Sequence, residues 1–128
     1  MTATLDSSAL TRFATQDRVT VARIQRLKDR DLWPPIVPTA VLVESLTGHG
    51  PRDARVNRLL RTCDIASLDI DVARSAARLR TSARRGSAVD AIVVATAEAA
   101  ASKLVITGDE SDISSLAAHA KDLSTMVI

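Results

Sequence analysis

The hydrophobic residues of this chain follow two alternating patterns. Short apolar runs, rich in Val, Ile, Leu and Ala, are separated by longer stretches whose apolar residues recur at the spacing of an amphipathic helix. This alternation is typical of β-strands connected by helices, the arrangement that builds a parallel sheet. We predict strands over residues 3–5, 36–37, 63–68, 103–107 and 126–128.

The segments between these strands predict helices, and several begin at a recognisable capping residue. Ser7 or Ser8 is the expected N-cap of the first helix, Asp69 or Asp71 of the fifth and Ser87 of the sixth, because such side chains accept hydrogen bonds from free N–H groups at a helix start. The predicted helices cover residues 7–15, 18–31, 38–48, 53–62, 69–84, 87–101 and 111–120.

The resulting order is β-α-α-β-α-α-β-α-α-β-α-β. We therefore expect a single-domain α/β fold over residues 1–128, a three-layer α/β/α sandwich with a central, mostly parallel sheet of four to five strands. A chain of 128 residues has room for one hydrophobic core.

The aromatic content, net charge and cysteine count of the chain exclude several classes of function. Aromatic residues make up only 2% of the chain, Phe13 and Trp33 alone, so the core is aliphatic and aromatic stacking cannot be the main means of gripping nucleobases. The net charge of +2 excludes a polybasic arm. Cys63 is the only cysteine, and neither a signal peptide nor an apolar run long enough to span a membrane is evident, so we expect a cytoplasmic protein without membrane contact.

Four acidic residues occupy positions that this fold would bring together. Asp6 follows the first predicted strand and Asp109 follows the fourth, so both are expected at the carboxyl edge of the sheet, where ligands bind in such folds. Glu44 lies in the first turns of the helix after the second strand, and Asp90 lies in the first turn of the helix before the fourth strand.

Carboxylates gathered at one edge need a compensating charge. Two of them about 4 Å apart repel by roughly 4 kcal/mol at an effective dielectric constant near 20. Either some of them take up protons or a cation binds. Oxygen ligands without His or Cys suit Mg²⁺, with Mn²⁺ as a substitute, and such clusters serve in metal-assisted hydrolysis of phosphodiesters.

The segments that carry these acids resemble the PIN-domain family and, within it, the VapC toxins of bacterial toxin–antitoxin pairs. The resemblance covers nearly the whole chain. The motifs that carry it are L-D-S-S-A-L, V-P-T-A-V-L-V-E, S-A-V-D-A-I-V-V-A-T-A and L-V-I-T-G-D-E-S-D-I.

The resemblance implies a Mg²⁺-dependent endoribonuclease that is silenced by a cognate VapB-type antitoxin and that forms a homodimer. By position, the family's acidic quartet falls on Asp6, Glu44, Asp90 and Asp109, with Asp112 as a further metal-ligating acid. The substrate would be single-stranded or loop RNA, cleaved by a metal-activated water to leave a 5′-phosphate and a 3′-hydroxyl. Thr107 matches a hydroxyl residue that commonly precedes the last acid.

Each acid also has a simpler interpretation. Asp6 alone could cap the first helix, Glu44 could face solvent, Asp90 could stabilise a helix start, Asp109 could be a turn residue, and Asp112, or Ser111 beside it, could cap the last helix. The interpretation of these residues as one site rests on their order along the chain and on the fold.

Two other functions remain open from the sequence. One is a degenerate PIN-like module that binds RNA or protein without cleaving it. The other is a haloacid-dehalogenase-like phosphotransferase with Asp6 as nucleophile and Lys103 as balancing cation, but that family has a second acid where this chain has Ser8, and Glu44 and Asp90 would be unexplained.

Two groups of arginines stand outside these motifs. Arg55, Arg58 and Arg61 recur at helical spacing, and Arg74 and Arg78 form a second pair. The simpler interpretation is that both groups lie on solvated helix faces. The functional interpretation is that they contact RNA or an antitoxin.

Overall fold

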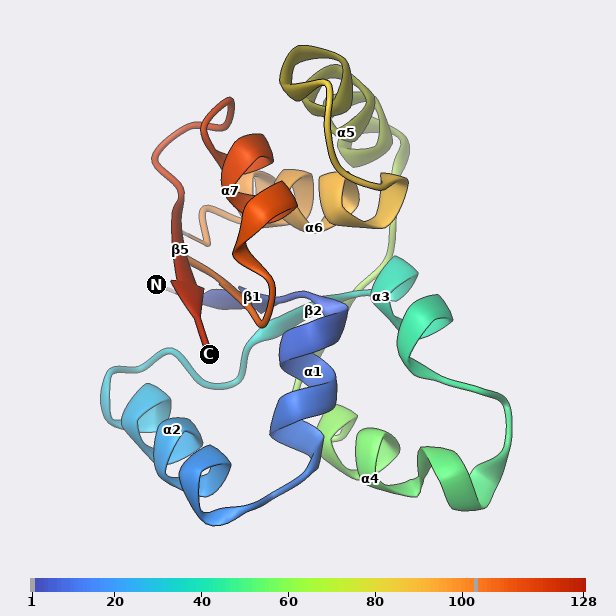
Figure 1. The fold of residues 1–128 in the computed structure, drawn as a ribbon, viewed down its shortest axis with the longest axis vertical. Helices are drawn as coiled ribbons and strands as arrows, with labels where there is room; N and C mark the ends of the chain where they lie inside the picture. Colours follow the sequence, from blue (N-terminus) through green and yellow to red (C-terminus); the bar gives the residue numbers. More distant parts are fainter. Residues whose placement is uncertain (1, 103) are drawn as a thin grey trace.

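A sheet of parallel strands forms the centre of the computed structural model, which describes residues 2–102 and 104–128 (Figure 1). The described part of the chain contains five strands in the order β3-β2-β1-β4-β5, and every neighbouring pair is parallel. The strands are β1 (Ala3–Leu5), β2 (Ile36–Pro38), β3 (Asp64–Ala66), β4 (Leu104–Thr107) and β5 (Ser124–Val127). The predicted order of strands and helices and the parallel sheet are confirmed.

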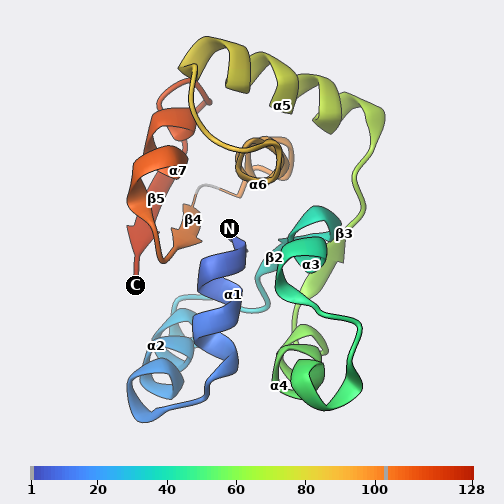
Figure 2. The same ribbon diagram turned by 45° about the vertical axis from the view of Figure 1, so that its right-hand side comes forward.

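Helices cover both faces of this sheet. Helices α5, α6 and α7 lie on one side, and α1, α2 and α4 lie on the other, with α3 following β2 (Figures 1 and 2). Their bounds are α1 (Ser7–Ala14), α2 (Arg18–Asp29), α3 (Thr39–Ser45), α4 (Gly50–Leu60), α5 (Ile70–Ala83), α6 (Ala88–Ala99) and α7 (Glu110–Ala117). None of the helices in the described ranges is both long and apolar enough to cross a membrane.

The helix caps correct two predictions. Asp6, not Ser7 or Ser8, caps α1, and Asp109, not Ser111 or Asp112, caps α7. Strand β1 ends one residue before Asp6 and β4 ends two residues before Asp109, and the extended backbone of each acid lets its side chain accept from a free N–H group of the helix. The predicted caps Asp69 and Ser87 are confirmed.

Several predicted boundaries move. Helix α4 begins at Gly50, three residues before the predicted start, because Pro51 is tolerated in a first helical turn. Strands β3 and β5 and the ends of α2, α3 and α7 also differ from their predicted bounds. The predicted fourth strand began at Lys103, which lies outside the described residues.

The core is aliphatic, as the composition predicts. Helix α6 carries an almost continuous buried run, which includes Val93 and Val94, because it packs on β1, β2 and β4 and is covered by α5 and α7. The two aromatic side chains meet edge to face, with the ring centroids of Phe13 and Trp33 6.1 Å apart. Trp33 therefore packs against the core rather than standing free for a partner.

Candidate active site

Asp6 is a buried carboxylate at the carboxyl end of β1. Its side chain is 5% exposed. Oδ1 accepts hydrogen bonds from the Ala9 backbone N–H at 2.8 Å and from the Ser8 hydroxyl at 2.7 Å, and Oδ2 accepts one from the Thr107 hydroxyl. These donors hold the charge and fix the orientation of the carboxylate, as buried ionic groups require.

Thr107 and Ser8 join this carboxylate to the end of β4. The Thr107 side chain is fully buried, and its hydroxyl accepts from the backbone N–H of Asp109 at 3.0 Å. The Ser8 hydroxyl accepts from the backbone N–H of Gly108 at 2.7 Å. A Cβ at Gly108 would lie 3.1 Å from the Ser8 side chain, so a glycine suits this close approach. The sequence offered no role for Ser8 beyond helix capping, because its partner Gly108 lies 100 residues away along the chain.

Glu44 lies on α3 and is exposed to solvent. The Ser7 hydroxyl donates to its Oε1 at 3.0 Å, which links α3 to the start of α1. Ser7 and Glu44 line an open cavity of about 400 Å³ together with Ser8, Thr11, Arg12 and Thr15. The cavity therefore gives solvent access along α1 close to Asp6.

Asp90 is half-buried at the start of α6. It forms a capping box with Ser87, in which the Asp90 N–H donates to the Ser87 hydroxyl at 3.0 Å and the Ser87 N–H donates to the Asp90 carboxylate at 3.3 Å. Burial raises the pKa of Asp90 most, and the negative charges of Asp112 and Asp6 raise it further, against the lowering effect of the Ser87 bonds. The charges of Asp6 and Asp112 therefore bear on Asp90.

Asp109 and Asp112 stand at the start of α7. Asp109 is exposed, and its Oδ1 accepts from the backbone N–H and the hydroxyl of Ser111, both at 3.3 Å. Asp112 does not cap the helix. It pairs instead with Arg85, with 3.4 Å between Oδ1 and Nε. No sequence signal pointed to Arg85, which is brought there by the turn between α5 and α6.

Of the predicted ligands, Asp6 lies near enough to Asp90 for its charge to act on it, but the acids do not form a closed ligand cage in the described residues. Within residues 2–102 and 104–128, no group of three or more His, Cys, Asp or Glu side chains is arranged to hold a metal ion. The donor set nevertheless fits a hard cation, because it consists of carboxylate oxygens and because the charges of Asp6 and Asp112 already bear on Asp90. The metal site itself stays a prediction.

Cys63 has no place in this chemistry. Its Sγ donates to the Leu59 carbonyl at 3.4 Å, and burial raises the pKa of the thiol to about 11. The thiolate is the reactive form of cysteine, so this residue is a packing element rather than a nucleophile.

Comparison with solved structures finds the same fold in toxin–antitoxin complexes. The chain is similar to VapBC2 from Rickettsia felis bound to a promoter DNA fragment, with a TM-score of 0.76 and 12% identity over 100% of this chain and 99% of that chain. It is similar to a toxin–antitoxin complex from Klebsiella pneumoniae, with a TM-score of 0.71 and 21% identity over 98% of this chain and 99% of the other.

A further similar structure is VapC20 from Mycobacterium tuberculosis, described as a Sarcin-Ricin loop cleaving toxin. Its TM-score is 0.64, with 20% identity over 94% of this chain and 98% of that chain. At these identities the likeness concerns the fold. A comparison with curated protein sequences gave no significant match. The family model of the PIN domain matches residues 3–119, and the chain therefore belongs to the PIN-domain family.

Proposed function

We propose that this protein is a VapC-type toxin of a type II toxin–antitoxin pair and acts as a Mg²⁺-dependent endoribonuclease. The observation that carries the proposal is the buried Asp6 carboxylate at the carboxyl edge of the sheet, near enough to the half-buried Asp90 for its charge to help raise the pKa of Asp90. The fold shared with VapC20, a Sarcin-Ricin loop cleaving toxin, supports RNA as the substrate.

In this proposal Asp6, Asp90 and Asp109 hold Mg²⁺, and Mn²⁺ substitutes for it. Bound there, the cation supplies charge neutralisation at the scissile phosphate and a lowered pKa for the attacking water. Glu44 either completes the ligand set or positions that water. Asp112 is engaged by Arg85, so we leave it outside the proposed ligand set.

Hydrogen bonds from neighbouring side chains orient the carboxylates of Asp6 and Glu44. Ser8 and Thr107 fix both oxygens of Asp6, and Ser7 donates a hydrogen bond to Glu44. Donors of this kind orient ligating carboxylates and commonly change metal affinity 10- to 100-fold when removed. The cavity along α1 leaves room for a single strand of RNA, whose unstacked bases are the usual target of sequence-specific recognition.

The test is to incubate the purified protein with structured and single-stranded RNA and to map the ends of the products, with Mg²⁺ and with EDTA. We expect 5′-phosphate and 3′-hydroxyl ends, no cleavage in EDTA and none by Asp90→Asn, with the exposed Asp64→Asn as a matched control that stays active. A 2′,3′-cyclic phosphate would exclude this mechanism. RNA binding without any cleavage would favour the non-catalytic PIN-like module.

The partner in this proposal is a VapB-like antitoxin that lies across the early helices. Helix α2 exposes Val19 and Val21, 60% and 48% accessible. A groove on the same helix is lined by Phe13, Leu27, Met126, Val127 and Ile128, and by Arg23, Arg26 and Arg30. An antitoxin segment on this surface would bring a basic side chain toward the acidic edge and compete with the cation. Expression of the protein alone should slow growth of a bacterial host, and co-expression of the antitoxin should restore it. Harmless expression of folded protein would contradict the toxin role.

We further propose that the toxin is a homodimer, assembled through the face around α3 and the start of α5. Val43 is 81% exposed and Ile70 is 64% exposed, with Leu68 between them in the chain. The Leu68 N–H donates to the Thr39 hydroxyl, which ties the two segments together. Sedimentation should give a dimer for the native chain and a monomer for Val43→Asp. A native monomer at micromolar concentration would contradict this assembly. We also propose a cytoplasmic location, because the proposed substrate is RNA and Cys63 is a free cysteine.

A further inference from the structure

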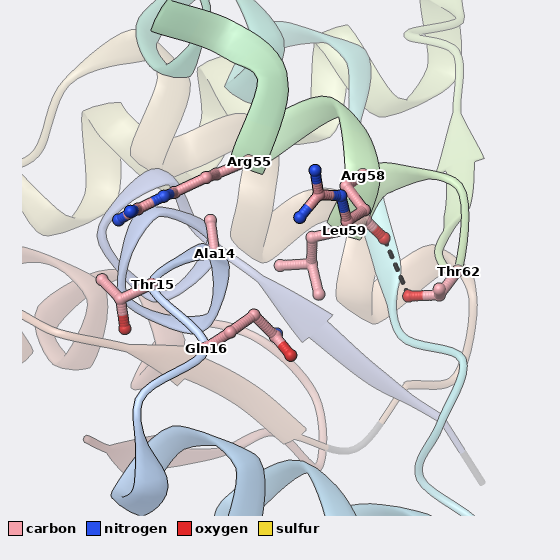
Figure 3. Close-up of a pocket in the computed structure, with 7 residues that line it drawn as sticks. All are labelled: Ala14, Thr15, Gln16, Arg55, Arg58, Leu59 and Thr62. Carbon is pink, nitrogen blue, oxygen red and sulfur yellow. Dashed lines mark hydrogen bonds between the residues drawn. The ribbon is translucent and has the colours of Figure 1, made fainter.

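A second cavity lies beside the one at Glu44, between the end of α1 and helix α4 (Figure 3). Its volume is about 330 Å³. The lining residues come from the two helices and the turns that follow them: Ala14, Thr15, Gln16, Arg55, Arg58, Leu59 and Thr62. Two of the three arginines at helical spacing, Arg55 and Arg58, therefore line this cavity, and Arg61 does not.

The two guanidinium groups bring positive charge to this cavity. Arg55 and Arg58 stand three residues apart on one face of α4, and both are exposed. In Figure 3 the Arg55 side chain extends over Ala14 at the end of α1, and the Arg58 guanidinium lies next to Leu59. Throughout the described ranges the single ion pair joins Arg85 to Asp112, so neither arginine of the cavity is neutralised there.

The nearest acids along the chain are already engaged elsewhere. The Asp53 carboxylate accepts from the N–H and hydroxyl of Thr47 and from the N–H of Gly48, all within 3.1 Å. Asp17 accepts from the Thr20 N–H at 2.8 Å and from the Thr15 hydroxyl at 3.2 Å. Two positive charges that line one cavity, without an ion pair to a carboxylate in the described residues, favour a bound anion, and guanidinium groups match phosphate oxygens.

The position of the cavity indicates which anion it takes. Thr15 lines both this cavity and the one that contains Ser7 and Glu44, so the two adjoin along α1. With a rise of 1.5 Å per residue, the path from Ser7 to Thr15 is about 12 Å long. This is the length of a few nucleotides, not of one phosphate group. A chain that carries a phosphate at every nucleotide can therefore reach the acidic edge and the arginines at once.

We infer that Arg55 and Arg58 bind a backbone phosphate of the single-stranded RNA substrate, a few nucleotides from the scissile bond. This inference rests on the proposed function and names the part of the protein that holds the flanking RNA. Such contacts position the strand without reading its sequence. An acidic segment of the antitoxin is the competing occupant. RNA is favoured because this cavity shares Thr15 with the one lined by Ser7, Ser8 and Glu44, and Ser8 contacts Asp6, where the phosphodiester is proposed to be cut.

The test measures RNA binding without cleavage. A fluorescent, single-stranded oligouridylate is titrated in EDTA with the full chain, and the affinity is followed by anisotropy over a series of salt concentrations. Each phosphate contact to a single strand contributes about 0.7 to the slope of log K against log salt. Because the two arginines share one phosphate in this inference, we expect Arg55→Ala/Arg58→Ala to lower the slope by about 0.7 and the affinity at low salt roughly tenfold.

Two further variants make the result specific. Arg74→Ala/Arg78→Ala removes the same charge from α5, on the other side of the sheet, and should leave slope and affinity near those of the native chain. Arg55→Lys/Arg58→Lys keeps the charge and should keep the slope while losing affinity, because lysine cannot form the two-pronged contact. Thermal unfolding would show whether the alanine variant is folded. If it is not, the lysine pair still tests the phosphate contact.

The outcomes separate this inference from the proposed function. Equal weakening of RNA binding by Arg55→Ala/Arg58→Ala and Arg74→Ala/Arg78→Ala would overturn the phosphate site. So would an effect of Arg55→Ala/Arg58→Ala on antitoxin binding but not on RNA binding. If RNA binds through the arginines but is never cut with Mg²⁺, the phosphate site stands and the nuclease proposal fails. If RNA is cut but its affinity is unchanged in Arg55→Ala/Arg58→Ala, the inference fails and the nuclease proposal stands.

Discussion

The hydroxyl of Thr107, at the end of β4, donates a hydrogen bond to Oδ2 of Asp6, at the end of β1. The two residues are 101 positions apart and meet because β1 and β4 are neighbours in the sheet, with Leu5 opposite Ile106. Both are buried. The contact therefore joins the first and last motifs of the candidate site and fixes the carboxylate that lies deepest in it.

Replacing Thr107 by valine keeps the shape and removes the hydroxyl. The Asp6 carboxylate and the Asp109 N–H would each lose a partner, so we expect the free energy of unfolding to fall by about 1–3 kcal/mol, measured by denaturant titration in EDTA. The shift of the melting temperature by Mn²⁺ should also shrink. Thr107→Ser keeps the hydroxyl and should lose less of both. Equal stability of Thr107→Val and the native chain would contradict the importance of this bond.

Asp90→Asn should separate stability from function. Because the folded state raises the pKa of Asp90, the folded protein holds this proton more tightly than the unfolded chain does. Stability is therefore lost as pH rises from the ordinary value of 3.8 through the raised pKa, when the ionised group meets Asp6 and Asp112. In EDTA at neutral pH we expect Asp90→Asn to melt at the same temperature as the native chain or higher.

The same substitution should abolish stabilisation by Mg²⁺ or Mn²⁺, because a ligand that binds only the folded state stabilises it in proportion to its affinity. Melting curves with and without the cation measure both effects on one sample. Asp64→Asn, on the exposed edge of β3, is the matched control and should change neither. A full cation response in Asp90→Asn would show that Asp90 is not a ligand.

The sequence predicted the fold, and the positions of Asp6 after β1 and Asp109 after β4, because these depend on local pattern. The apolar runs that end at Leu5 and Thr107 define strands, and the residues after parallel strands share one edge of the sheet. What the sequence did not predict is how those acids are held. The contact of Ser8 with Gly108 depends on which strands are neighbours. The choice of Asp6 over Ser7 as helix cap depends on the residue at which β1 ends.

Asp53 should govern the stability of the loop between α3 and α4. Hydrogen bonds from the backbone of Thr47, then from its hydroxyl and from Gly48, lower the pKa of Asp53 against the opposing effect of burial. The contribution of this group is fully present above the ordinary pKa of 3.8 and is lost as pH falls through the lowered value. Asp53→Asn should lower the melting temperature at neutral pH, and the difference from the native chain should shrink in acid.

The measurement is a set of melting curves from neutral pH to below pH 3.8, with Asp64→Asn as the exposed control. A difference between Asp53→Asn and the native chain that stays constant down to the lowest pH would mean that the charge of Asp53 does not matter. Because α4 carries Arg55 and Arg58, a loosened loop should also weaken RNA binding in EDTA.

Ser7 should act on catalysis without acting on stability. Its hydroxyl donates to Oε1 of Glu44 at 3.0 Å in an exposed position, so Ser7→Ala should change the free energy of unfolding by no more than about 0.5 kcal/mol. Glu44 would lose the contact that holds it over the cavity. If Glu44 positions the attacking water, kcat for RNA cleavage should fall by roughly tenfold with little change in KM, because the interaction matters in the transition state.

Two controls test this route. Ser7→Thr, which keeps the hydroxyl, should recover most of the rate, whereas Glu44→Gln combined with Ser7→Ala should be no slower than Glu44→Gln alone. A purely additive double variant would mean that Ser7 acts on the reaction by a route other than Glu44.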